Sequence, residues 1–337
     1  MKNTNPEAID PQSLPKQGYT DDGQGAKNKL TKNHVYSSYQ NQEPEASPHI
    51  PVLMSEVLHF LHPQKADSYL DLTAGYGGHA NAVLESTLSP DKATLVDRDQ
   101  YAIGYLQQRF RGQGVEIIHQ DYLSASQELL VAGRQYSLIL ADLGVSSPHL
   151  DSASRGFSLK TDGPLDMRMD DRQSVTAHDI VNSYDEATLT DLLIRYGQEP
   201  RARKIARLIV EHRPISGTRQ LASIVAQAWP GHSKVHPATR TFQALRIAVN
   251  DELAQLERAL PIWIDLLAPE GRIVVISFHS LEDRLVKVAF NQEAGDHYDA
   301  RLRLLTKHPV EGSQAEIVLN PRARSAKLRA AVKTKTN

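Results

Sequence analysis

Cysteine is absent from the 337-residue sequence. The chain therefore cannot form disulfides, thiolate zinc sites or cysteine-held iron–sulfur clusters, and it has no cysteine nucleophile. Long apolar runs are also missing: no stretch approaches the roughly 18 residues of a membrane span, and the N-terminus lacks a signal-type apolar core. An excess of basic charge is missing as well, since the net charge is −2. We therefore expect a cytoplasmic protein with no membrane partner, in which any nucleic-acid binding comes from local patches.

The first 48 residues differ in composition from the rest of the chain. They are rich in Asn, Gln, Pro, Ser and Lys, and their few apolar residues follow no period. A segment of this kind buries too little apolar surface to offset the entropy that it would lose on ordering. We predict a disordered N-terminal extension over 1–48.

Strand-like and helical segments alternate after this extension. The apolar runs that are typical of strands are Ser68–Leu72, Ala93–Asp97, Val115–His119, Tyr136–Asp142 and, after a long interval, Gly271–Ser277. Near-continuous Val, Ile and Leu strands separated by helices indicate a parallel sheet that is covered on both faces. The predicted fold class is α/β, with a mainly parallel sheet.

One strand–turn–helix segment is the first candidate for a binding site. Asp71 ends a strand, Gly75, Gly77 and Gly78 follow in the turn, and Asp97 ends the next strand. Glycine tolerates positive φ and lets a backbone approach a ligand, while a carboxylate at the end of the second strand can accept hydrogen bonds from both hydroxyls of a ribose. The segment predicts a nucleoside-containing cofactor.

Three interpretations of this turn remain open at this point. A dinucleotide site requires G-x-G-x-x-G, but here the spacing is Gly75-x-Gly77-Gly78. Asp71 would repel a pyrophosphate, whereas it suits S-adenosylmethionine, which carries an ammonium and a sulfonium and has no phosphate. The third interpretation is an ordinary glycine turn. The residues favour the methyl donor, although short glycine patterns are weak evidence.

The interval between the fourth and fifth strands is predicted to be helical. In the helix predicted over 201–213, apolar residues form one stripe, and the basic residues on the other side are Arg201, Arg203, Lys204 and Arg207. That side is either a solvated face or a ridge that contacts phosphates. His232 and His236 are four residues apart, but no third ligand accompanies them, so we predict no metal site.

The chain ends in a basic segment, which contains no acidic residue after Glu316. We interpret 326–337 as a basic tail. Neutralising Arg322, Arg324, Lys327 and Arg329 is expected to lower RNA affinity and flatten its salt dependence, because each phosphate contact releases counterions. The preceding stretches Tyr298–Thr306 and Ala315–Leu319 are candidates for an antiparallel pair.

Several longer motifs in order resemble one family. They are DLTAGYGGH, DLGVSSP, RGFS, DGPLDMRMD, HPATRTFQALRIAVN, GRIVVISFHSLEDR and NPRARSAKLR. They resemble the RsmH (MraW) family over about 49–329. The resemblance implies a Rossmann-like class I methyltransferase core (49–146 and 237–325) with an inserted helical substrate-recognition domain (147–236). It also implies S-adenosylmethionine-dependent methylation of the N4 exocyclic amine of a cytidine in the decoding region of small-subunit (16S) ribosomal RNA.

The resemblance further implies which residues contact the methyl donor. In addition to Asp71 and Gly75, which the turn itself indicates, the matching positions are Gly77, Gly78, His79, Asp97, Tyr122, Asp142 and His149. Tyr122 stands where the family often has Phe packing on the adenine, and His149 stands where it often has Gln. Gln198 departs from a pair of acidic residues that the family pattern places there.

Methylation of an exocyclic amine places demands on the acceptor side of the site. The lone pair of the amine is delocalised into the ring, so the enzyme must orient it and remove a proton. The strand-end run Asp142-Leu143-Gly144-Val145-Ser146-Ser147-Pro148 has no aromatic clamp, and we expect Ser146 and Ser147 to orient N4. Asp166, His279 and Asp283 are candidates for the proton acceptor or base reader; alternatively Asp166 and Asp283 pair with Arg168 and Arg284. Methylation of a pyrimidine ring carbon is disfavoured because it normally begins with thiolate attack.

The expected partner is small-subunit ribosomal RNA, and a homodimer is compatible with the sequence. Because a duplex hides N4, the cytidine must be unpaired or flipped out. Two rivals remain: a non-catalytic RNA-binding or ribosome-assembly factor that keeps the cofactor fold, and a nicotinamide-dependent oxidoreductase. A methyl-transfer assay separates the first from an enzyme, and cofactor soaking separates the second.

Overall fold

A computed structural model describes residues 50–144, 152–159, 161–229, 231, 236–295 and 300–334. Outside these ranges lie the predicted N-terminal extension and the predicted site residues Ser146, Ser147 and His149, together with His232. No helix among the described residues is both long and apolar enough to cross a membrane.

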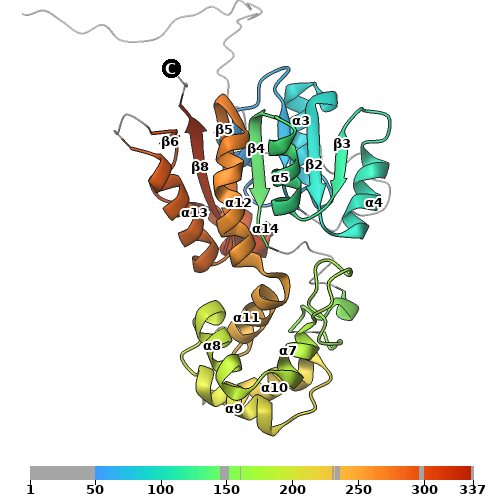
Figure 1. Ribbon diagram of the computed structural model, residues 1–337, viewed down its shortest axis with the longest axis vertical. Coiled ribbons are helices and arrows are strands. Elements are labelled where there is room, and N and C mark those ends of the chain that lie inside the picture. The colour runs from blue at the N-terminus through green and yellow to red at the C-terminus, as the bar shows by residue number, and fades with distance from the viewer. Residues whose placement is uncertain are drawn as a thin grey trace, which may run out of the picture. The chain divides into compact units, whose positions relative to one another are not determined.

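A sheet in the order β3-β2-β1-β4-β5-β8-β6 forms the core, with β7 paired to β8 (Figure 1). Its strands are β1 (Tyr69–Asp71), β2 (Ala93–Asp97), β3 (Glu116–His119), β4 (Tyr136–Asp142), β5 (Leu267–Ser277), β6 (Leu302–Leu304), β7 (Val310–Glu311) and β8 (Lys327–Lys333). The strands from β3 to β5 are parallel, and β8 is antiparallel to β5. The mainly parallel α/β fold that the sequence predicts is confirmed.

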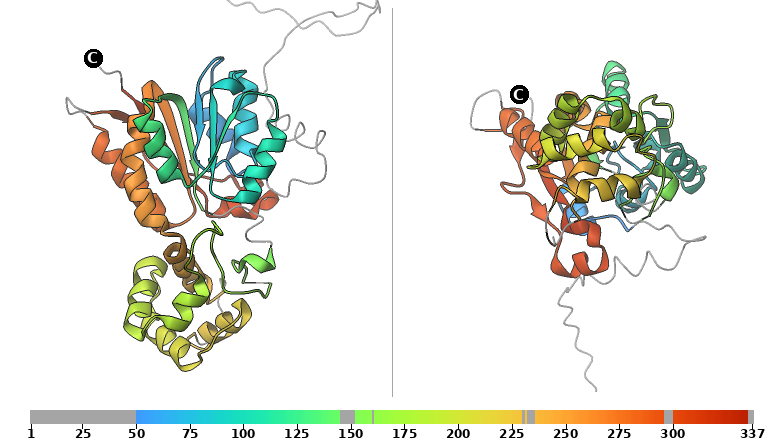
Figure 2. Two further views of the ribbon diagram at one scale, coloured as in Figure 1. Left: turned by 45° about the vertical axis from the view of Figure 1, so that its right-hand side comes forward. Right: turned by 90° about the horizontal axis from the view of Figure 1, so that it is seen from below.

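Two layers of helices cover the sheet, as Figure 2 shows. The helices of the core are α2 (Met54–Leu61), α3 (Gly78–Thr87), α4 (Gln100–Arg109), α5 (Tyr122–Val131), α12 (Glu252–Leu266), α13 (Ser280–Glu293) and α14 (Gln314–Leu319). Helices α5, α12 and α13 pack on one face, and α2, α3 and α4 pack on the other. Strand β4 serves both layers, because Ile139 and Ala141 face the first while Leu138 and Leu140 face the second.

The inserted helices are α7 (Ala177–Ser183), α8 (Glu186–Gly197), α9 (Ala202–Glu211), α10 (Thr218–Ala226) and α11 (Thr239–Asn250). They share a separate apolar cluster with Phe157, Leu165, Met167 and Met169 from the preceding loop. Thr176 caps α7 through a capping box, and Asp185 caps α8, as their positions before helical runs predict.

The return from the insert to the core lies later than the predicted boundary at 236/237. Helix α11 contributes Phe242, Leu245 and Val249 to the apolar cluster of the insert. The sequence predicts a long helical region over 238–267 that is interrupted at Pro261. The interruption lies instead at Asp251, which adopts φ 49°, and α12 continues through Pro261. Helix α11 therefore belongs to the insert, and the chain re-enters the core at Asp251.

The predicted basic tail is wrong, because most of it forms strand β8. Leu328, Ala330 and Ala331 are fully buried, and β8 pairs with β5, β6 and β7. The strand is buried on both faces, because Leu328 and Ala330 belong to one apolar cluster and Ala331 to the other. Arg329 is buried as well and is compensated by Asp283. The predicted strand pair is half right: β6 exists, whereas Gln314–Leu319 is helix α14.

The sequence also predicts Ser55 and Thr218 as helix N-caps, because each precedes a helical run, but neither is one. Ser55 lies inside α2, whose N-cap is Leu53 in a left-handed conformation. Thr218 is the first residue of α10 and not its cap, because its hydroxyl oxygen accepts the backbone N–H of Gly163. The backbone N–H of Leu53 donates to Glu316 and the Thr218 hydroxyl accepts from Gly163, so both helix starts depend on partners that are distant in the sequence.

Candidate active site

A cavity of about 460 Å³ lies at the carboxyl ends of the parallel strands. One side is formed by the ends of β1, β2 and β4, including Gly75, Asp97 and Asp142. The other side comes from the insert and the end of β5, with Phe242, Arg246 and His279 among its residues. This volume is in the range of small-molecule sites, and the position is where ligands bind in open α/β sheets.

The glycine turn is shaped by two positive φ angles, 53° at Gly75 and 74° at Gly77. At Gly77 and Gly78, glycine is also required because a side chain would not fit. A Cβ on Gly77 would lie 2.9 Å from Phe110 Cε2, and one on Gly78 would lie 2.3 Å from Pro51 Cγ. At Gly75 the nearest atom would be Thr73 O at 3.9 Å. Gly75 therefore leaves room on the cavity side, whereas Gly77 and Gly78 are glycine because the protein packs against them. Their predicted contacts with the methyl donor stay predictions.

Gly78→Ala is expected to destabilise the ligand-free protein by about 1–3 kcal/mol, because Pro51 must move to admit the methyl group. Urea denaturation without ligand measures this change. Gly104→Ala in α4 is the matched control, since its Cβ would meet no atom within 4 Å. Unchanged stability of Gly78→Ala together with lost ligand binding would instead assign this glycine to the ligand.

Asp97 holds the glycine turn in place. Its Oδ2 accepts the backbone N–H of Gly75 at 2.7 Å, and its Oδ1 accepts the backbone N–H of Asp99 at 2.8 Å. Asp97 therefore orients the turn through both of its carboxylate oxygens. It lines the cavity, as a ribose contact requires.

Asp71 lies beneath the cavity and is almost fully buried. Its carboxylate accepts hydrogen bonds from Tyr69 Oη at 2.7 Å and from the Thr73 backbone N–H at 3.2 Å. Burial raises the pKa of Asp71 to about 7, against the lowering effect of these two bonds, and Asp97 adds a smaller increase. Asp71 can thus gain or lose a proton near neutral pH.

Asp142 and His79 form a second buried pair, with Asp142 Oδ2 3.7 Å from His79 Nδ1. Burial lowers the pKa of His79 to about 4, so the ring is neutral, and Nε2 donates to the Val52 carbonyl at 2.9 Å. Burial, followed by Asp71 and Glu282, raises the pKa of Asp142 well above its usual range. Asp142 Oδ1 is buried and has no hydrogen-bond partner among the described residues. A residue of the cavity wall thus contains a polar atom that the described protein groups leave without a hydrogen bond.

Tyr122 lines the cavity at the start of α5, but most of its ring is covered. Its ring packs edge-on against Trp263 with centroids 5.5 Å apart, and the Arg98 guanidinium lies 5.7 Å from the ring centroid. The hydroxyl, which Phe would lack, donates to the Glu252 carbonyl at 3.2 Å. Tyrosine is therefore accommodated here, and its predicted packing on adenine stays a prediction.

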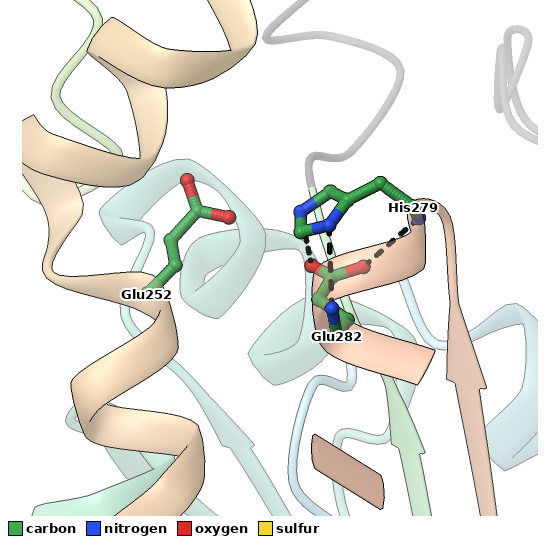
Figure 3. A group of neighbouring side chains, drawn as sticks. All are labelled: Glu252, His279 and Glu282. Carbon is green, nitrogen blue, oxygen red and sulfur yellow. Dashed lines mark hydrogen bonds and ion pairs between the residues drawn. The ribbon is translucent and has the colours of Figure 1, made fainter. Parts of the chain in front are cut away.

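His279 comes from the loop after β5 and lines the insert side of the cavity. Its Nδ1 accepts the backbone N–H of Glu282 at 3.3 Å and caps α13. Its Nε2 lies 3.2 Å from Glu282 Oε1 without hydrogen-bond geometry. Figure 3 shows the imidazole turned toward Glu282. Since Nδ1 is used as the acceptor for the cap, His279 does not fit the predicted role of proton acceptor.

The two remaining acidic candidates, Asp166 and Asp283, each form an ion pair with an arginine. Burial raises the pKa of Asp166, but its two hydrogen bonds with Arg168, at 2.8 and 3.0 Å, outweigh burial and leave the pKa below the usual range. Asp283 pairs with Arg329 at 2.7 and 3.2 Å, and not with Arg284. Neither carboxylate lines the cavity. The structural pairing of Asp166 with Arg168 is present, and neither residue is placed as a proton acceptor or base reader.

Helix α11 supplies cavity residues that the sequence analysis did not identify. Phe242, Gln243 and Arg246 all line the cavity. A signal was available, because Arg246 follows Phe242 by four residues and so lies close to the apolar side of the helix. Gln198, the departure in the insert, accepts a hydrogen bond from Ser280 Oγ at 2.8 Å and so connects the insert to the core.

Comparisons with known proteins agree with this arrangement. The model of the MraW methylase family matches residues 46–334. The chain is 48% identical over 293 residues to the ribosomal RNA small subunit methyltransferase H of a Cyanothece species, covering 86% of this chain and 95% of that protein. It is 44% identical over 308 residues to the protein of the same name from Trichormus variabilis, covering 90% of this chain and 97% of that protein.

Proposed function

The chain belongs to the MraW methylase family, and on that premise we propose that it methylates N4 of a cytidine in small-subunit ribosomal RNA. S-adenosylmethionine is the methyl donor. The observation that carries the proposal is the two-sided cavity, which joins strand-end carboxylates to an apolar wall from the insert. The names of the relatives, ribosomal RNA small subunit methyltransferase H, support the RNA class.

The residues on the strand side fit the methyl donor. Asp97 brings a carboxylate to the cavity at the end of β2, Gly75 leaves open space, and Asp142 Oδ1 is a buried oxygen without a partner among the described residues. Asp71 adds negative potential, which suits a cationic ligand and opposes a pyrophosphate. The same carboxylates disfavour a nicotinamide-dependent oxidoreductase. When bound, the donor supplies a methyl group on a positively charged sulfur.

The acceptor side must orient a weakly nucleophilic amine and take up one proton. Asp142 is the best placed carboxyl for the proton, because it lies at the end of β4, lines the cavity and has a raised pKa. His79 Nδ1 faces its second oxygen and can stabilise the protonated form. We retain Ser146 and Ser147, which follow β4, as the residues that orient N4. Apolar residues of the insert exclude water from the reacting groups.

RNA is proposed to contact the exposed side of α9 in the insert. Arg203, Lys204 and Arg207 are exposed there, with Arg207 3.8 Å from Glu186. Arg201 differs from the other three, because its guanidinium lies 4.8 Å from the Trp229 ring centroid and donates to the Ala228 carbonyl. Arg201 thus stabilises the insert, while the other three remain candidates for phosphate contacts. We propose a cytoplasmic enzyme and leave a homodimer as one possible assembly.

The test is methyl transfer from labelled S-adenosylmethionine to small subunits from cells that lack this gene. Mass spectrometry of nucleosides should reveal N4-methylated cytidine at one position, and subunits from complemented cells should accept no label. Incorporation into a ring carbon or into another nucleoside would contradict the proposal. Donor binding without any transfer would support the rival assembly factor.

Donor affinity is expected to increase as pH rises from about 6 toward 7.5. A bound cation lowers the pKa of Asp71, which is about 7 in the free protein, so binding releases protons and weakens up to tenfold per pH unit below 7. Calorimetry in buffers of different ionisation enthalpy counts the protons released. Asp71→Asn should reduce this count, leaving the contribution of Asp142. Proton uptake by the wild-type protein on binding would refute the assignment.

A further inference from the structure

The insert side of the cavity combines apolar walls with one buried arginine. Phe157, Met167, Met169, Phe242 and Phe278 line it. Flat apolar walls accept the face of any base, because stacking discriminates little between bases. Selection of one base in such a pocket therefore requires a polar group with defined geometry, and Arg246 lines the same side.

Arg246 is held rigidly by two acidic residues. Its Nε and Nη2 donate to the two carboxylate oxygens of Glu252 at 2.9 and 2.8 Å. Nη2 also lies 3.9 Å from Glu282 Oε1. The Arg246 side chain is 15% exposed, and those of Glu252 and Glu282 are 6% and 3% exposed. Such a forked pair fixes the plane of the guanidinium.

One nitrogen of Arg246 remains available. Nη1 carries two N–H groups, and it makes no hydrogen bond within the described part of the chain. Because Arg246 lines the cavity, Nη1 can donate to a ligand atom that accepts a hydrogen bond. Since Glu252 already orients the other edge, Nη1 has a fixed direction without any rearrangement.

A metal ion is the alternative occupant of this cluster. Glu252, His279 and Glu282 each offer a ligand atom, and these atoms lie within 4.8 Å of one another (Figure 3). However, Arg246 already uses both oxygens of Glu252. A divalent ion would have to displace a guanidinium or remain beside its positive charge. The cluster therefore serves Arg246 better than it serves a metal.

We propose that Arg246 reads the target cytosine by donating a hydrogen bond from Nη1 to ring atom N3. This inference rests on the proposed function. N3 of cytosine is an acceptor beside the reacting amine, whereas N3 of uracil carries a hydrogen and would oppose an arginine donor. Glu252 and Glu282 act as positioning residues, because they hold the guanidinium and do not face the base themselves. The hydrogen bond also fixes N4 relative to the strand side of the cavity.

The proposal is tested by a double-mutant cycle in which one change is made in the protein and the other in the substrate. The protein variants are Arg246→Lys and the charge-balanced double variant Arg246→Gln/Glu252→Gln, which leaves no unpaired Glu252 carboxylate. The substrate change is 3-deazacytidine at the target position of reconstituted small subunits. It retains the amine and replaces the N3 acceptor with C–H. Arg240→Gln is the control on the same helix, since Arg240 bonds the Gln198 carbonyl and does not line the cavity.

Wild-type protein is expected to lose about 10- to 200-fold in kcat/KM on 3-deazacytidine. Both Arg246 variants should lose a similar factor on cytidine and then change less than about threefold on 3-deazacytidine, because the partner of N3 is already missing. Melting temperature and donor affinity, measured in parallel, should stay near wild type for the double variant. Arg240→Gln should retain the full sensitivity to the deaza substitution.

Additive losses in the variants, or a wild-type enzyme indifferent to 3-deazacytidine, would overturn the role of Arg246. Failure of the proposed function has a different outcome, because wild-type protein would then not methylate the cytidine of unsubstituted subunits at all. If the double variant melts early, Arg246→Lys supplies the cycle, since it preserves the charge but not the fork.

Discussion

Asp97→Ala is expected to weaken binding of S-adenosylmethionine by at least about 100-fold, equivalent to about 2.7 kcal/mol. Two losses combine in this variant. The ribose hydroxyls lose a charged acceptor, and Gly75 and Asp99 lose the carboxylate that orients their backbone N–H groups. The glycine turn would then sample other conformations before it binds. Isothermal titration calorimetry at constant pH measures the effect.

Asp121→Ala is the matched control for Asp97→Ala. Asp121 precedes α5 and accepts two backbone N–H groups, from Leu123 and Ser124, but it does not line the cavity. Removing it should destabilise the protein by about 1 kcal/mol, as loss of a helix cap does, and leave donor affinity unchanged. An Asp97→Ala protein with wild-type affinity would remove the ribose assignment and, with it, the strand side of the site.

Arg329→Gln is expected to cost about 3–5 kcal/mol of folding stability, because it leaves the Asp283 carboxylate without its partner. The Arg329 and Asp283 side chains are 8% and 15% exposed and share two hydrogen bonds. Arg329 lies in β8, so the loss affects the sheet and not an exposed tail. Urea denaturation should therefore reveal a large decrease in the midpoint.

The double variant Arg329→Gln/Asp283→Asn separates pairing from packing. It removes both charges, so it should recover much of the stability that Arg329→Gln loses. Arg324→Gln is the exposed control and should change stability by less than about 0.5 kcal/mol. If Arg329→Gln instead melts like wild type and weakens RNA binding, the basic segment acts on RNA as its composition indicates.

The order of strands and helices could be predicted from the sequence because each strand of the parallel sheet is a continuous apolar run. Continuous apolar runs ending in Asp71, Asp97 and Asp142 place carboxylates at one edge of the sheet, since parallel strands end there together. The side-chain caps of α7 and α8, Thr176 and Asp185, are equally local. The strand side of the candidate site follows from such patterns.

Contacts between residues that are distant in the sequence could not be predicted from local patterns. The sequence alone identified the basic composition of β8, but the burial of Arg329 depends on Asp283, which is far away in the chain. Likewise, Gly77 and Gly78 indicate a ligand loop, yet their lack of a side chain is required by Phe110 and Pro51. The sequence shows where charged residues and glycines occur. The role of each one depends on the residues that the fold places beside it.

The sequence by itself thus determined the fold class, the carboxylate-rich strand ends and the family. The tertiary structure decided which polar groups remain available at the cavity. Asp166 and Asp283 are neutralised by arginines, whereas Asp142 retains an oxygen without a partner within the described residues, and Arg246 retains Nη1. Most polar side chains form hydrogen bonds or ion pairs with partners that are distant in the sequence. Which polar groups can still bind a ligand is therefore known only from the tertiary structure.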